Sequence, residues 1–105
     1  MADLTAALQD IRTKVAAAVD AVDDDGKASP VLVAVVREFA TKTDKAIGLS
    51  RDPATATFGL YEAEQAGDSA RYAAEADTGA ADATRSVVLD AHLAICTLKA
   101  SVSPG

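Results

Sequence analysis

The sequence is poor in the residue types that most often carry catalysis and metal binding. Among its 105 residues it has one cysteine, one histidine and no tryptophan, with only two phenylalanines and two tyrosines. A single cysteine excludes an intramolecular disulfide. A single histidine excludes di-iron bundles of the ferritin type, which need a Glu-x-x-His motif on two helices. With so few acid–base and nucleophilic groups, the sequence favours a protein that is not an enzyme and holds no cofactor.

A concentrated positive charge and a long apolar run are also missing. Ten basic residues are scattered among sixteen acidic ones, for a net charge of −6. Nucleic-acid binding needs a basic stripe, so we expect neither nucleic-acid nor anionic membrane partners. The longest strongly apolar run, VLVAVV at 31–36, is far too short to span a bilayer. The first ten residues do not have the basic and apolar regions of a secretory signal, so we expect a cytoplasmic protein.

Alanine, in contrast, is abundant, with 25 residues of the 105. It is the best helix former, and it buries little apolar area per residue. This composition predicts helices that form easily around a small core. Apolar surface shared between copies would supply the missing burial, so we expect self-association, most simply as a homodimer.

Helical periodicity predicts one all-α domain over residues 1–105, an antiparallel bundle with helices at about 3–22, 30–47, 53–77 and 80–101. The sequence leaves open whether residues 53–101 form one rod or two helices, so the bundle has three or four helices. Ser29-Pro30 and Asp52-Pro53 are typical of helix N-termini, and Asp3 suits the first cap. Three of the segments have clear apolar stripes, namely Leu4, Leu8, Ile11, Val15, Ala18 and Val22; Leu32, Val36, Phe39, Thr43 and Ile47; and Thr84, Val88, Ala91, Ile95, Leu98 and Val102.

The third segment has the weakest pattern. Its best stripe is Phe58, Tyr61, Gln65, Ser69, Tyr72 and Ala76, and Gly67 allows a kink. We expect the two tyrosines in the core, because aromatic residues at helical spacing usually face inward. The alternative is that they anchor an interface beside the acidic residues of this segment, which suit a basic protein partner. The candidate interaction residues are therefore Tyr61, Tyr72, Glu62, Glu64 and Glu75.

The acidic stretch VDDDGKA at 22–28 has some of the ligands of a calcium loop. With Gly26 at position 6 of an EF-hand loop, Asp23 and Asp25 stand at positions 3 and 5. Ala21 and Leu32 then occupy positions 1 and 12, where oxygen ligands are required. We therefore expect a solvated, mobile turn between the first two helices.

His92 and Cys96 stand four residues apart, so they share one face of the last predicted helix. This spacing suits two metal ligands. The other ligands would have to be carboxylates, such as Glu38, Glu62, Glu64 or Asp90. The simpler interpretation, which we adopt, has no metal site, with Cys96 in the core and His92 at the bundle edge. The sequence thus predicts a non-enzymatic interaction or scaffold module; a small-ligand- or metal-binding bundle using His92 and Cys96 is the alternative.

Overall fold

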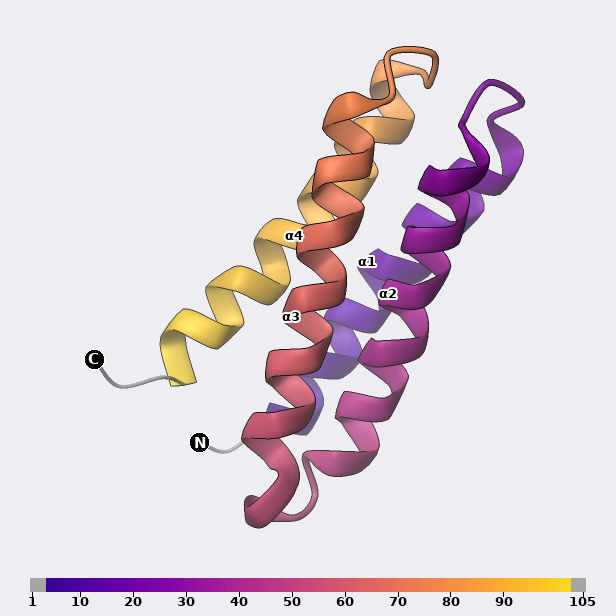
Figure 1. Ribbon diagram of the computed structural model, residues 1–105. Coiled ribbons are helices and arrows are strands. Elements are labelled where there is room, and N and C mark those ends of the chain that lie inside the picture. Colours follow the sequence, from indigo (N-terminus) through magenta and orange to yellow (C-terminus); the bar gives the residue numbers. More distant parts are fainter. Residues whose placement is uncertain (1–3, 103–105) are drawn as a thin grey trace.

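The computed structural model describes residues 4–102 and consists of four α-helices (Figure 1). Helix α1 spans Leu4–Asp24, α2 spans Pro30–Leu49, α3 spans Pro53–Ala76 and α4 spans Asp82–Val102. The all-α prediction is confirmed, and the region 53–101 contains two helices separated at 77–81. The predicted cap Asp3 lies outside the described residues.

The four helices alternate in direction, and each packs on two neighbours. Helix α2 packs on α1 and α3, while α4 packs on α3 and α1, with the most extensive contact between α2 and α3. The α1–α2 and α3–α4 links lie at one end of the bundle, the upper end in Figure 1, and the α2–α3 link lies at the other. None of the described helices combines the length and apolar character needed to cross a bilayer.

The starts of α2 and α3 follow the sequence prediction. The Ser29 side chain accepts a hydrogen bond from the backbone N–H of Leu32 (3.1 Å), and the Asp52 carboxylate accepts one from Ala54 (3.0 Å). Each cap is followed by a proline, whose missing N–H would have had no partner at that position. Both helix starts are therefore confirmed in their capping geometry.

The core follows the predicted stripes of α1, α2 and α4, except that Leu4 and Leu98 are only partly buried and Val102 is exposed. Phe39 is the largest fully buried side chain. Alanine contributes eight of the nineteen buried hydrophobic residues in the described part of the chain, so the core is thin, as the composition predicts. The buried residues on these three helices are Leu8, Ile11, Val15, Ala18 and Val22; Leu32, Val36, Phe39, Thr43, Ala46 and Ile47; and Thr84, Val88, Ala91 and Ile95.

For α3 the predicted stripe is wrong. Tyr61 and Tyr72 are 48% and 66% exposed, and Phe58 is 53% exposed, so the expectation of tyrosines in the core fails. Apart from Leu60, glycine and alanine form the buried face instead, and these small residues allow α3 to approach its neighbours closely. The residues of this face are Gly59, Leu60, Ala63, Ala66, Gly67, Ala70 and Ala74.

Gly67 explains why a face of small residues is turned inward. A Cβ atom at this position would lie 3.0 Å from Cζ of Phe39 and 3.2 Å from Cγ2 of Ile95. The glycine therefore makes room for the one aromatic ring that is buried among the described residues. Helix α3 runs without a break through this position, so Gly67 serves close packing rather than a kink.

Two glycine-to-alanine substitutions test this role. Gly67→Ala should lower the free energy of unfolding, because overpacking a core costs about 1–3 kcal/mol and exceeds the gain in helix propensity. Gly48→Ala is the matched control, since nothing lies within 4 Å of a Cβ atom there. It should raise the free energy of unfolding by about 0.5–1 kcal/mol. Urea denaturation followed by circular dichroism measures both, and equal stabilisation by the two changes would contradict the packing described.

The acidic turn at 22–28 is tied down and is not the free loop that we expected. The Asp25 carboxylate accepts hydrogen bonds from the backbone N–H of Lys27 (2.9 Å) and, across the end of the bundle, from that of Ala81 (2.8 Å). In the opposite direction, Asp77 of the α3–α4 link accepts one from the backbone N–H of Ser29 (2.8 Å). Each link thus supplies a carboxylate to the other, an arrangement that we call the carboxylate clasp (Asp25 and Asp77).

Backbone hydrogen bonds hold the pKa of both clasp carboxyls below the usual value. For Asp25 the main contribution comes from the N–H of Ala81, and for Asp77 from that of Ser29. Because these pKa values are lower in the folded than in the unfolded chain, the clasp stabilises the fold above the ordinary pKa of 3.8. That stabilisation is lost as the pH falls through the folded-state pKa values.

The clasp predicts a dependence of stability on acid. Asp25→Asn and Asp77→Asn should each lower the melting temperature at neutral pH, whereas Asp24→Asn, on an exposed neighbour, should not. The double variant should also lose less stability than the wild type when the pH is lowered through the carboxylate range. Thermal unfolding monitored by circular dichroism across that range checks both points. A double variant with the melting temperature and acid response of the wild type would show that the clasp contributes nothing.

Candidate functional site

An open apolar groove runs between α1 and α4, the least extensively packed of the four neighbouring pairs. It encloses about 560 Å³. Ile11 lies at its buried floor, and Leu93 at its rim is 64% exposed. The other lining residues are Ala7, Asp10, Lys14, Asp90, Ala94, Thr97, Leu98 and Ser101. A large aliphatic side chain facing solvent beside such a groove is the form expected of a surface that receives another helix.

Charges of both signs stand on this groove. Lys14 and Asp10 lie one helical turn apart on α1, and Asp90 lies on α4. None of the three forms an ion pair within the described residues, although nine such pairs occur there. The groove therefore offers unpaired charges at its edges as well as an apolar centre.

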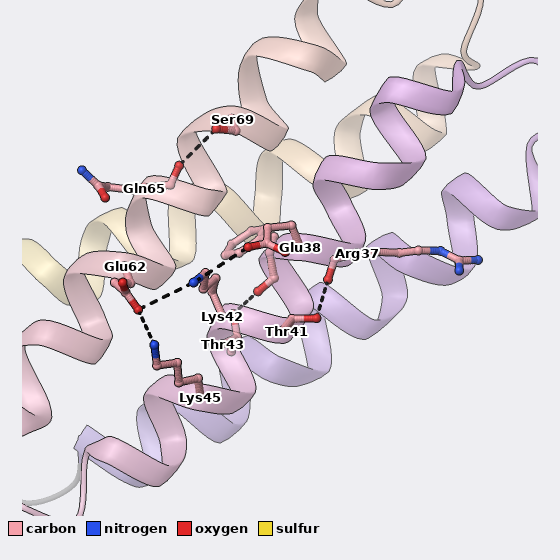
Figure 2. Close-up of polar contacts among 10 residues, drawn as sticks. Arg37, Glu38, Thr41, Lys42, Thr43, Lys45, Glu62, Gln65 and Ser69 are labelled. Carbon is pink, nitrogen blue, oxygen red and sulfur yellow. Dashed lines mark hydrogen bonds and ion pairs between the residues drawn. The ribbon is translucent and has the colours of Figure 1, made fainter.

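The interaction residues predicted from the sequence lie on the outer face of α3 and on its flanks, where Glu62 faces α2 and Glu64 faces α4. The acids among them are already paired with bases of this chain, which leaves less free negative charge than the sequence suggests. Glu62 lies 2.9 Å from Lys45 and 3.8 Å from Lys42 of α2, as Figure 2 shows. Glu75 pairs with Arg71 at 3.2 Å, and Glu64 pairs with Lys99 at 3.4 Å.

The exposed aromatic rings of α3 are covered in a similar way. Lys99 lies over the ring of Tyr61, 5.6 Å from its centroid, and Arg71 lies over Tyr72 at the same distance. Both tyrosines are accessible, as an interface would require. The cations that a basic partner would bring to these rings are, however, already supplied by the chain itself.

A compact polar cluster joins α3 to α4. Nε2 of His92 lies 2.8 Å from Oδ1 of Asp68 and 3.2 Å from Sγ of Cys96. The potential ligand atoms of these three residues all lie within 4.8 Å of one another. Each of the three side chains is partly buried. The structure thus brings His92 and Cys96 together as their spacing predicts, and adds Asp68, which the sequence analysis did not select.

Asp68 and Cys96 approach the same nitrogen of the His92 ring, and this geometry limits the chemistry of the cluster. In a Cys–His–Asp catalytic relay, the thiol and the carboxylate contact opposite nitrogens of the imidazole. Here Asp68 and Cys96 both contact Nε2, which can carry only one proton between them. The geometry therefore does not match a nucleophile with its general base.

The surroundings of Cys96 also keep its thiol protonated. Burial raises the pKa of the Cys96 thiol, and the negative charges of Glu64 and Asp68 raise it further, while Arg71 partly opposes them. A reactive cysteine needs the reverse, a pKa lowered by nearby positive charge. Glu64 lies four residues before Asp68 on the same helix, and its carboxylate pairs with Lys99 of α4.

The other carboxylates considered from the sequence as metal ligands do not join this cluster. Glu38 and Glu62 pair with lysines near the α2–α3 contact, and Asp90 lines the α1–α4 groove.

Comparison with protein-family models, with curated proteins and with solved structures gives no match for this chain.

The effect of Glu64 on Cys96 predicts a change in thiol reactivity. Glu64→Gln should lower the pKa of Cys96 and increase its reaction rate with a disulfide reagent a few-fold at mildly alkaline pH, because more thiolate is present. Glu75→Gln, which changes a more distant acid of the same helix, should leave the rate unaltered. Stopped-flow absorbance with Ellman's reagent measures the rates. An unchanged or lower rate for Glu64→Gln would place Glu64 away from the thiol.

Proposed function

We propose that this chain is a non-enzymatic interaction module that self-associates through the groove between α1 and α4. The observation that carries the proposal is Leu93, a large aliphatic side chain that is 64% exposed beside an open apolar groove. The alanine-rich core supports it, because the bundle buries little apolar area within itself. A second copy with its own Leu93 is the simplest source of complementary surface.

The charges at the groove favour a second copy as the occupant. A two-fold axis through the centre of the groove brings the Lys14 end of one copy over the Asp10 end of the other. Each lysine then meets an acid, and this contact forms twice, as a two-fold interface requires. Two helices of about 30 Å, each about 10 Å wide, offer roughly 600 Å² per copy, at the lower limit for stable interfaces. We therefore expect a dimer of micromolar affinity.

The proposal includes no catalytic step. The raised pKa of Cys96 and the shared contact at Nε2 of His92 both weigh against a cysteine nucleophile. We also propose a cytoplasmic location, where a reducing environment would keep this lone cysteine free. A second, basic protein partner on the outer face of α3 has less support, since Glu62, Glu64 and Glu75 are all paired within the chain.

A pair of substitutions matched in exposure tests the interface. Leu93→Glu should convert the dimer to a monomer at micromolar concentration, because it places two like charges in an apolar contact. Val31→Glu, at a residue that is also 64% exposed but does not line the groove, should leave the dimer intact. Sedimentation equilibrium measures the mass of each. A monomeric wild type, or equal effects of the two changes, would overturn the proposal.

A charge exchange tests the orientation of the two copies. Lys14→Glu should weaken the dimer, since the introduced acid faces Asp10 of the second copy. Adding Asp10→Lys to the same chain should restore it by reversing both charges. Failure of the second change to restore the dimer would exclude this two-fold arrangement. Dissociation of the dimer by Leu93→Glu would still support the groove as the interface.

A further inference from the structure

We propose that Asp68, His92 and Cys96, with Glu64 as the fourth ligand, form a binding site for a divalent metal ion of the zinc class between α3 and α4. The site is separate from the α1–α4 groove and does not depend on self-association. It extends the two-residue pair visible in the sequence to a cluster of three ligands, to which the proposal adds Glu64.

The distances fit a single ion shared by the three clustered residues. Ligand atoms bound to tetrahedral zinc at about 2.0–2.3 Å lie about 3.3–3.8 Å apart. The observed separations are 2.8 Å from His92 Nε2 to Asp68 Oδ1 and 3.2 Å to Cys96 Sγ, and the ligand atoms of all three residues lie within 4.8 Å of one another. Opening the two short contacts by about 0.5 Å or less would bring them into the zinc range. An ion in this position would also satisfy all three side chains at once, whereas one proton on Nε2 cannot serve both neighbours.

Helix geometry supplies the fourth ligand. His92 and Cys96 are four residues apart on α4, and Glu64 and Asp68 are four residues apart on the adjacent helix α3. Residues at this spacing lie on one helix face. Because Asp68 already lies with His92 and Cys96, Glu64 is one turn away from the cluster on the same face of α3. Glu64 is partly buried, and its carboxylate lies 3.4 Å from Nζ of Lys99 on α4. Lys99 is therefore the competitor that the ion must displace from Glu64.

The ligand types select the class of metal. One imidazole nitrogen, one thiolate sulfur and two carboxylate oxygens form a mixed set, which suits the borderline ion Zn²⁺. Calcium and magnesium prefer oxygen ligands alone, so a site that contains Cys96 and His92 disfavours them. Co²⁺ takes the same tetrahedral geometry and reports on it through its absorption spectrum, which makes it the appropriate probe.

Titration of the untagged, reduced protein with Co²⁺ tests the site. The wild type should bind one equivalent, with the visible bands of tetrahedral cobalt and an ultraviolet thiolate-to-cobalt band, and Zn²⁺ should displace the cobalt. Cys96→Ser should remove the thiolate band, and His92→Ala and Asp68→Asn should weaken binding roughly tenfold or more, since even outer-shell changes cost 10–100-fold. Asp90→Asn, two residues from His92 but on the groove, should bind as the wild type does.

Two further variants test the fourth ligand. Glu64→Gln should weaken Co²⁺ binding, and Lys99→Met should strengthen it because the carboxylate is released. Circular dichroism of each metal-free variant confirms that its helices are intact. A wild type that gives no tetrahedral cobalt spectrum, or Cys96→Ser and His92→Ala variants that bind Co²⁺ as the wild type does, would overturn the site. If Glu64→Gln binds Co²⁺ with the wild-type affinity, the metal site has three protein ligands and the assignment of Glu64 is refuted.

Discussion

The close approach of α3 to the Phe39 ring is the constraint on which the other features of this bundle depend. The core has one large aromatic residue, and it lies fully buried against a position where even a Cβ atom would crowd the ring. The ring therefore requires glycine at position 67, and most of the other buried positions of α3 are alanine. This requirement fixes the rotation of α3 about its own axis, and so determines which of its side chains face α4 and which face solvent.

Both candidate sites follow from that rotation. Because Gly59, Ala63 and Gly67 face the core, Glu64 and Asp68 lie on the side of α3 next to α4. There Asp68 meets His92 and Cys96, which are also four residues apart. Tyr61 and Tyr72 are carried outward, beneath Lys99 and Arg71. On the other side of the bundle, α1 and α4 pack least extensively, and the apolar groove with the exposed Leu93 lies between them. The clasp of Asp25 and Asp77 then holds the two hairpins together at one end.

The sequence predicted the parts of this structure that depend on local patterns. The stripes of α1, α2 and α4 and the Ser-Pro and Asp-Pro caps are local signals. The caps are confirmed, and so are the stripes except at the bundle end, where Leu4 and Leu98 are half-buried and Val102 is exposed. The buried face of α3 was not predictable in this way, because size mattered more than hydrophobicity and a partner ring on α2 decided the orientation. Because the orientation of α3 was predicted wrongly, the sequence analysis did not select Asp68 as a neighbour of His92. The spacing of Asp68 from Glu64 matches that of His92 and Cys96, a signal readable in the sequence once the two helices are known to be neighbours.

The environment of the Phe39 ring is the most direct test of the rotation of α3. In two-dimensional nuclear Overhauser spectra, the structure predicts cross-peaks from the Phe39 ring protons to the α-protons of Gly67 and to the γ2-methyl group of Ile95. It also predicts that the rings of Tyr61 and Tyr72 show no contacts to the buried stripe of α1. Cross-peaks between either tyrosine ring and Leu8 or Val15, with none between Phe39 and Gly67, would contradict it. Helix α3 would then face inward through its aromatic stripe, and neither the metal cluster nor its neighbours could assemble as described.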